Sequence, residues 1–116
     1  MKTTNPMKML AVMSVLAGAL CCWSAKAADA QGNWDKNCAA CHGKDGKGQT
    51  MMGRKLGMKD YTDPKVQDSF TDEQAIKAIK DGVTEDGKTK MKPFADKLSD
   101  DEIKALVKHV REFKGK

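Results

Sequence analysis

The chain has 116 residues, of which 32% are charged and 5% aromatic, and its formal net charge is +5. Three basic residues and no acidic ones lie in the first 27 residues, so the remaining 89 residues carry a net charge of only +2. So small a charge gives no reason to expect nucleic-acid binding. Eighty-nine residues make one small domain with a modest core, which favours stabilisation by a prosthetic group.

Residues 1–27 have the pattern of a secretory signal peptide. Two lysines precede an uninterrupted run of 13 apolar and small residues, Leu10 to Cys22, and a small-x-small cleavage site ends at Ala27. The run is shorter than a membrane-spanning helix requires, although an uncleaved anchor remains the alternative. Leu20 before Cys21 does not suit lipidation. We therefore expect a cleavable signal over residues 1–27, one domain over residues 28–116 and a periplasmic location.

The five residues from Cys38 to His42 read C-A-A-C-H, the pattern that attaches a c-type haem. Two thiols on one helical turn can reach neighbouring vinyl groups of the porphyrin, and the histidine can then ligate the iron. A thioredoxin-type dithiol would need a βαβ context, and no strand-like segment is evident. A zinc site needs four ligands, and beyond the leader only His109 adds to this group. The motif predicts thioethers at Cys38 and Cys41 and a proximal ligand at His42.

The remaining pattern, in chain order, predicts short helices joined by long loops. The first helix should cover about residues 32–41 and end at Gly43. Five glycines over residues 43–57 predict a loop. Asp63-Pro64 has the form of an N-cap followed by proline at the first helical position, which predicts a short helix over residues 65–69.

Two later helices are marked by capping boxes, in which a hydroxyl residue is followed three positions later by Glu or Gln. Thr71 with Gln74 opens the first of these helices, and Gly82 is placed to end it. Ser99 with Glu102 opens the last helix, where apolar residues then recur at helical spacing. These apolar stripes predict core packing and not a second cofactor site.

After the leader, the chain resembles the class I cytochromes c, small monohaem electron carriers with His/Met ligation. The resemblance rests on the C-A-A-C-H motif, preceded by Trp34, and on Met91-Lys92-Pro93-Phe94 ahead of the last helix. It implies an all-α fold of about four short helices and long loops wrapped around one covalent haem c. It also implies that Met91 is the distal iron ligand. The other methionines beyond the leader are the alternatives: Met51, Met52 and Met58.

One feature of the resembling family is missing. Its members often have a proline after the haem motif whose carbonyl accepts a hydrogen bond from the proximal imidazole. Residues 43–63 contain no proline. We therefore expect another backbone carbonyl to orient His42.

The resemblance implies a soluble monomeric carrier, not an enzyme, that shuttles single electrons between redox proteins, as in a respiratory chain. The alternatives are a haem subunit or fragment of an oxidoreductase, and a haem-based sensor whose weak sixth ligand gives way to NO or CO. Contact with membrane-bound redox complexes should be peripheral at most. Basic residues beside the two motifs predict docking on acidic patches of redox partners. These residues are Lys44, Lys47, Lys88, Lys90 and Lys92.

Overall fold

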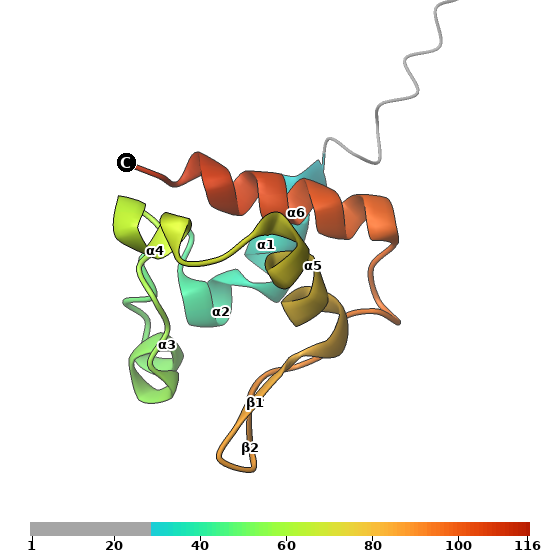
Figure 1. The fold of residues 1–116 in the computed structure, drawn as a ribbon, viewed down its shortest axis with the longest axis horizontal. Coiled ribbons are helices and arrows are strands. Elements are labelled where there is room, and N and C mark those ends of the chain that lie inside the picture. The colour runs from blue at the N-terminus through green and yellow to red at the C-terminus, as the bar shows by residue number, and fades with distance from the viewer. Residues whose placement is uncertain (1–28) are drawn as a thin grey trace, which may run out of the picture.

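The computed structural model describes residues 29–116, and the signal peptide expected over residues 1–27 lies outside the described residues. Six helices and one hairpin make up the described fold (Figure 1). In chain order they are α1 (Ala30–Asn37), α2 (Ala39–His42), α3 (Met51–Leu56), α4 (Pro64–Asp68), α5 (Asp72–Asp81), β1 (Val83–Glu85), β2 (Lys88–Met91) and α6 (Asp100–Glu112). The predicted all-α class is confirmed. No helix within residues 29–116 is long and apolar enough to cross a membrane.

Helix α6 organises the core, because it contacts both α1 and α5. Its apolar stripe is buried as predicted, with Ile103 and Leu106 almost fully inaccessible. The helix begins at Ser99, whose side chain accepts a hydrogen bond from the backbone N–H of Glu102, while the Glu102 carboxylate accepts one from the Ser99 N–H. The same reciprocal pair between Thr71 and Gln74 opens α5. Both predicted capping boxes are confirmed.

The single helix predicted over residues 32–41 is wrong, because the chain forms two shorter helices there. Helix α1 ends at Asn37 and α2 begins at Ala39, with Cys38 between them at φ −117°. The N–H of Cys38 still bonds the carbonyl of Trp34 at 2.9 Å, so the helical hydrogen-bond pattern of α1 extends to Cys38. Gly43, at φ 79°, ends α2 as predicted.

The prediction of a loop over residues 43–57 is wrong where α3 forms. Thr50 caps this helix by accepting a hydrogen bond from the N–H of Gly53 at 2.8 Å, and Gly57 ends it in the left-handed region. Gly53 is needed for another reason. A Cβ atom there would overlap the carbonyl oxygens of Cys41 and Gly48, so only glycine lets α3 approach the end of α2 this closely.

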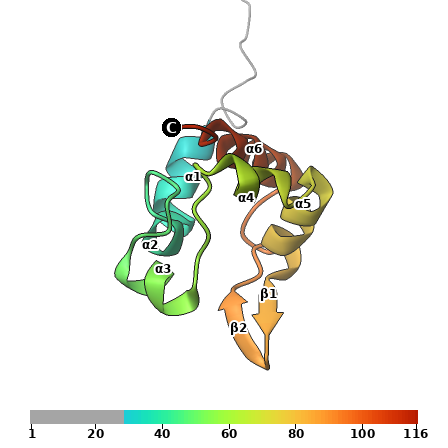
Figure 2. The ribbon, with the colours of Figure 1, turned by 60° about the vertical axis from the view of Figure 1, so that its left-hand side comes forward.

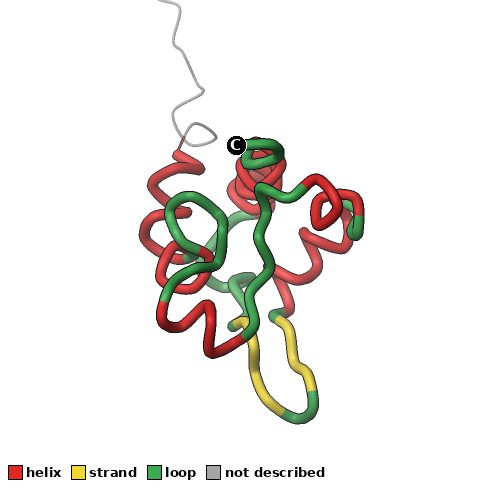
Figure 3. The backbone as a smooth tube through the Cα atoms, turned by 90° about the vertical axis from the view of Figure 1, so that its left-hand side faces the viewer, coloured by secondary structure: helices red, strands yellow, loops and turns green. Residues whose placement is uncertain are grey.

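The expectation that the chain lacks strands is also wrong, since β1 and β2 form an antiparallel hairpin. Its turn residues Asp86 and Gly87 both have positive φ, 51° and 73°, as a type I′ turn requires. The Asp-Gly pair is therefore the sequence signal that indicates this hairpin. Figure 3 shows the hairpin extending away from the helices. It provides no βαβ unit, so the argument against a thioredoxin-type dithiol stands.

A buried polar network joins the C-terminal end of α6 to α4 and the start of α5. The guanidinium of Arg111 donates hydrogen bonds to the Gln67 carbonyl at 2.5 Å, to the Phe70 carbonyl at 2.8 Å and to the Asp72 carboxylate at 2.9 Å. Gln67 is 2% exposed and donates to the carbonyls of Tyr61 and Val110. The segment between α3 and α5 is therefore held against α6 by charge-assisted hydrogen bonds.

Replacing Arg111 with alanine should lower the free energy of unfolding by about 3 kcal/mol, because three carbonyl or carboxylate acceptors lose their donor. Lys114→Ala is the matched control. Its exposed ion pair with Asp68 should be worth only about 0.5 kcal/mol. Guanidinium titrations followed by circular dichroism measure both changes, and equal losses in the two variants would contradict the assignment.

Candidate functional site

A cavity of about 290 Å³ lies between the helices and the hairpin. Residues of α1, α2, the loop after α3, α5, the hairpin and α6 form its wall. Figure 2 shows α2 and α3 together on one side of the molecule and α5 with the hairpin on the other. Most of the lining side chains are apolar or aromatic, and Cys38, His42 and Met91 are among them.

Two predicted site residues, Cys38 and His42, lie together in the wall formed by α1 and α2. Burial, with a smaller effect of the neighbouring Cys41, raises the pKa of the Cys38 thiol to about 11. Burial also lowers the pKa of His42. The imidazole is therefore held neutral, which is the form that ligates a metal ion.

Several contacts hold the end of α2 in place. The indole of Trp34 donates a hydrogen bond to the Gly43 carbonyl at 3.0 Å, and its ring lies 5.6 Å from that of His42. The carbonyl of Cys41 accepts from the Thr50 hydroxyl at 2.9 Å, and the carbonyl of His42 accepts from the Gly48 N–H at 2.8 Å. The backbone of the C-A-A-C-H motif is thus pinned by α1 and by the loop before α3.

The side chain of His42 is buried, yet its Nδ1 atom has no hydrogen-bond partner among the described residues. The Gly43 carbonyl is already taken by Trp34 and by the N–H of Gly46. The carbonyl that we expect to orient His42 therefore remains a prediction. A neutral imidazole in the wall of a mainly apolar cavity is suited to be an iron ligand.

Tyr61 and Phe70 line the cavity beside the histidine, and neither is among the predicted site residues. The Tyr61 ring lies 5.4 Å from the His42 ring and 5.9 Å from that of Phe70. Burial, and next to it the proximity of Cys38, raises the pKa of Tyr61, so its hydroxyl stays protonated. Both rings belong to segments held by the Arg111 network, and no local sequence signal points to them.

The four candidate methionines separate into two pairs. Met51 and Met52, on α3, are 87% and 47% exposed and do not line the cavity. Met58 and Met91 do line it. Met91 is carried by β2, and the chain just after it is tied to the end of α5, because the N–H of Phe94 bonds the Ile79 carbonyl at 2.8 Å.

The basic residues beside the two motifs do not form one group. Lys90 lines the cavity, and Lys88 and Lys92 are exposed on either side of it along the same segment. Lys44 lines a separate cavity between α1 and the end of α6. Lys47 is partly exposed in the loop between α2 and α3. Of the five predicted docking lysines, only Lys90 therefore lines the cavity, and Lys88 and Lys92 are its neighbours along the chain.

The family model described as cytochrome C oxidase, cbb3-type, subunit III matches residues 25–110, most of the sequence. The chain belongs to this family. It is a small monohaem c-type cytochrome, and the class predicted from the sequence is confirmed. Members of this class carry a covalently bound haem c and transfer electrons through it. No curated protein matches the chain.

Solved structures of c-type cytochromes agree with the family. The c-type cytochrome KustC0563 is 38% identical, with a TM-score of 0.67 over 74% of this chain and 98% of that one. A mutant of Kustc0563 is also 38% identical, with a TM-score of 0.65 over 74% of this chain and 99% of that one. The similarity therefore covers nearly the whole of each of these cytochromes.

The cavity fits the haem that the family implies. Its wall is mainly apolar, a neutral imidazole with an unpartnered nitrogen lies in it, and one thiol of the attachment motif is beside that imidazole. Cys41 is partly exposed at the next turn of the same short segment. Cys38 therefore lies in the same wall as the histidine, and Cys41 lies one helical turn further along without lining the cavity.

We expect protein matured in the periplasm to carry one haem that survives acid-acetone extraction. Cys38→Ser and Cys41→Ser should each remove one thioether and reduce assembly strongly, because each thiol is one of two covalent attachments. Mass spectrometry of the intact protein measures the added haem. Met52→Ser, an exposed change on α3, is the control that should leave the attachment unchanged. Fully extractable haem in the unmodified protein would contradict covalent attachment.

Proposed function

We propose that this c-type cytochrome is a carrier of single electrons in which Cys38 and Cys41 hold the haem and His42 and Met91 ligate its iron. The observation that carries the proposal is the one cavity that has His42 and Met91 in its wall. If His42 and Met91 both hold the iron, no ligand position would remain for a substrate. This supports a carrier over an oxidase or a peroxidase.

When bound, the haem supplies an iron that cycles between the ferric and ferrous states. The protein's own groups hold the site fixed while the charge changes. Trp34 and Thr50 pin the backbone around His42, and the bonds from Phe94 to the end of α5 pin the chain after Met91. Apolar side chains keep water away. A thioether ligand is soft and favours the ferrous state, which raises the reduction potential.

Met91 is favoured over Met58 by the side of the cavity from which each comes. The two residues that would hold the haem iron should come from opposite walls of the cavity. Met58 follows α3, which packs against the α2 helix that carries His42. Met91 comes from the hairpin on the other side of the molecule (Figure 2). His42 and Met91 would therefore hold the haem from opposite walls, whereas His42 and Met58 come from the same side.

Gly82 makes the position of Met91 possible. It has φ 75° at the end of α5, and a Cβ atom there would lie 2.5 Å from the Met91 carbonyl oxygen and 2.9 Å from the Pro93 nitrogen. Both the positive φ and the close approach require glycine. Strand β2 and the residues after it thus pass directly over the end of α5, and this close packing supports the position of Met91 in the cavity wall.

Replacing Met91 with alanine should abolish the weak sulfur-to-iron absorption band of the ferric protein and lower the midpoint potential, while covalent haem is retained. Met58→Ala is the matched control, because it removes the other thioether that lines the cavity. That variant should keep the band. Loss of the band in Met58→Ala, with the band retained in Met91→Ala, would reverse the assignment.

We also propose that the protein acts after export, as the leader pattern and the haem chemistry of c-type cytochromes suggest. The family description names a subunit of an oxidase. A cytochrome domain held in such a complex is therefore the second candidate. Fractionation of cells followed by haem staining distinguishes the two. A carrier elutes as a small protein of the periplasmic fraction, whereas a subunit remains with the membrane complex.

We also propose that Lys88, Lys90 and Lys92, called the hairpin lysines, bind redox partners. Lys90 lines the cavity, Lys88 and Lys92 are exposed on the same segment, and no ion pair joins the three to an acid within the described residues. By contrast, Lys80 and Lys114 are each paired with an aspartate elsewhere on the surface. Unpaired cations at the cavity edge favour a partner with an acidic docking face.

Reversing the charge of all three hairpin lysines to glutamate should slow oxidation by the anionic complex hexacyanoferrate(III) about tenfold at low salt and flatten the salt dependence. The matched control reverses three exposed lysines away from the hairpin and changes the net charge equally. Its residues are Lys65, Lys97 and Lys104. Stopped-flow absorbance measures both rates. Equal slowing in the two triple variants would mean that only net charge matters.

A further inference from the structure

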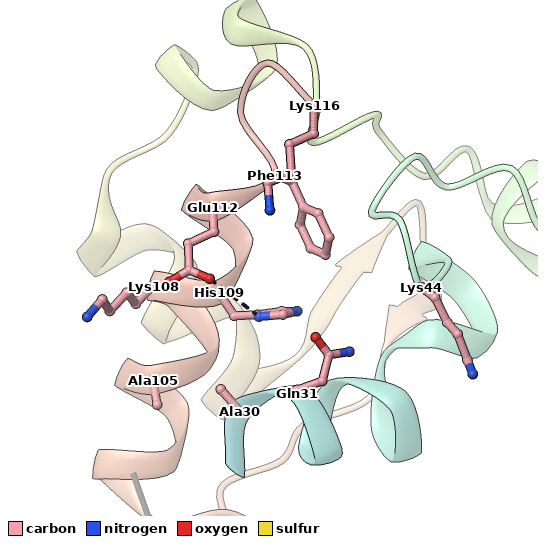
Figure 4. A pocket seen from close by; sticks show the side chains of 9 residues that line it. All are labelled: Ala30, Gln31, Lys44, Ala105, Lys108, His109, Glu112, Phe113 and Lys116. Atoms are coloured by element: carbon pink, nitrogen blue, oxygen red, sulfur yellow. Dashed lines mark ion pairs between the residues drawn. The ribbon is translucent and has the colours of Figure 1, made fainter. Parts of the chain in front are cut away.

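A second cavity, of about 530 Å³, lies between α1 and the C-terminal half of α6 (Figure 4). The proposed function does not use it. His109 projects from α6 into the space between the two helices, beside Phe113 and opposite Gln31. It is a titratable side chain, 13% exposed, at the inner wall of an otherwise open cavity.

The two nitrogen atoms of His109 have different surroundings. Nδ1 lies 3.9 Å from the carboxylate of Glu112. Nε2 is buried and has no hydrogen-bond partner. Within residues 29–116, the only other buried side-chain nitrogen or oxygen without a partner is Nδ1 of His42. Both histidines contact the same indole.

Trp34 connects the two histidines. Its ring lies 5.5 Å from the His109 ring and 5.6 Å from the His42 ring, and it is 2% exposed. Phe113 closes the outer side of the stack, 5.1 Å from Trp34 and 5.0 Å from His109. The path between His109 and the proximal ligand is therefore filled by one aromatic ring and contains no bulk water. Charges at its two ends are poorly screened from each other.

The charged groups around His109 come from three parts of the chain. Glu112 and Lys108 come from α6, Lys44 comes from the loop after α2, and Lys116 comes from the end of the chain. From α1 the cavity receives only Ala30 and Gln31, which are uncharged. Histidine is the only one of these residue types whose ordinary pKa lies near neutral pH, so His109 is the candidate here for a change of charge.

We propose that His109 is a redox-linked proton site. When the haem is reduced, a fraction of the protein molecules takes up a proton at this histidine. The inference rests on the proposed ligation of the iron by His42. Oxidised iron carries one more positive charge than reduced iron, so it disfavours a second positive charge beyond Trp34. Reduction removes that repulsion and raises the proton affinity of His109. The cytochrome then transfers a proton together with part of its electron flux.

The step balances without a further reagent. The electron comes from the donor protein and resides on the iron, and the proton comes from water that reaches the open cavity. Because Nε2 is buried and Nδ1 faces the Glu112 carboxylate, Nδ1 is the nitrogen that gains the second proton. Oxidation reverses both transfers. No bond other than the N–H bond forms or breaks.

Spectroelectrochemical titration of the haem-loaded protein between about pH 5 and about pH 8 tests the proposal. The midpoint potential should fall as the pH rises in the unmodified protein. His109→Gln should remove this component of the fall. Because glutamine leaves a gap between Trp34 and Phe113, His109→Tyr provides a second variant that keeps an aromatic ring there. Both should show the same flattened profile.

Lys65→Gln is the matched control, since it removes an exposed positive charge outside this cavity. It should shift the potential equally at every pH and keep the slope. Haem propionates also titrate, so the result is judged by the difference between the unmodified protein and the two His109 variants. An identical pH profile in all of them overturns the proposal.

Nuclear magnetic resonance gives an independent readout. The pH midpoint of the His109 ring resonances should be higher in the ferrous than in the ferric protein, and equal midpoints overturn the proposal. Absorption spectra of the same samples separate this outcome from failure of the proposed function. A low-spin spectrum with the sulfur-to-iron band, combined with equal midpoints, rejects only the proton site. A high-spin spectrum rejects the proposed ligand pair.

Discussion

The contacts of one indole, that of Trp34, hold the first and last helices of this cytochrome together at the haem motif. The ring is almost fully buried, donates a hydrogen bond to the carbonyl that follows His42, and packs on His42, His109 and Phe113. Because α1 and α6 are far apart in sequence, their pairing has to be stabilised by contacts of this kind. The orientation of the attachment motif relative to the core follows from it.

The other side of the site depends on backbone geometry more than on side-chain packing. The return strand passes over the end of α5 because Gly82 has no Cβ atom, and the N–H groups of Phe94 and Ala95 bond carbonyls at the end of that helix. These bonds satisfy carbonyl groups at the end of the helix that have no partner within it. Met91 is thereby supported by α5, while His42 is supported by α1 and α3. Two independently anchored walls suit a site that should change little between oxidation states.

The middle of the chain shows how a segment without a strong local signal is ordered. Residues 57–70 contain only one short helix, yet Tyr61 and Phe70 form part of the cavity wall. They are held because Arg111 and Gln67 place donors against the carbonyls of this segment. A buried network of this kind is favourable only when every member is satisfied. It is a tertiary feature, assembled from residues more than 40 positions apart.

The sequence by itself determined the cofactor class, the helical class, both capping boxes and the apolar stripe of the last helix, because each of these is encoded within a few neighbouring residues. It favoured Met91 as the distal ligand over three other methionines. It missed α3, where Gly53 is required by packing, and the hairpin, although its Asp-Gly turn is a local signal. Only the tertiary structure showed that Met51 and Met52 face away from the cavity and that His109 lies against Trp34. The physical reason is that burial and proximity depend on how distant segments pack, whereas caps, turns and the haem motif depend on covalent spacing alone.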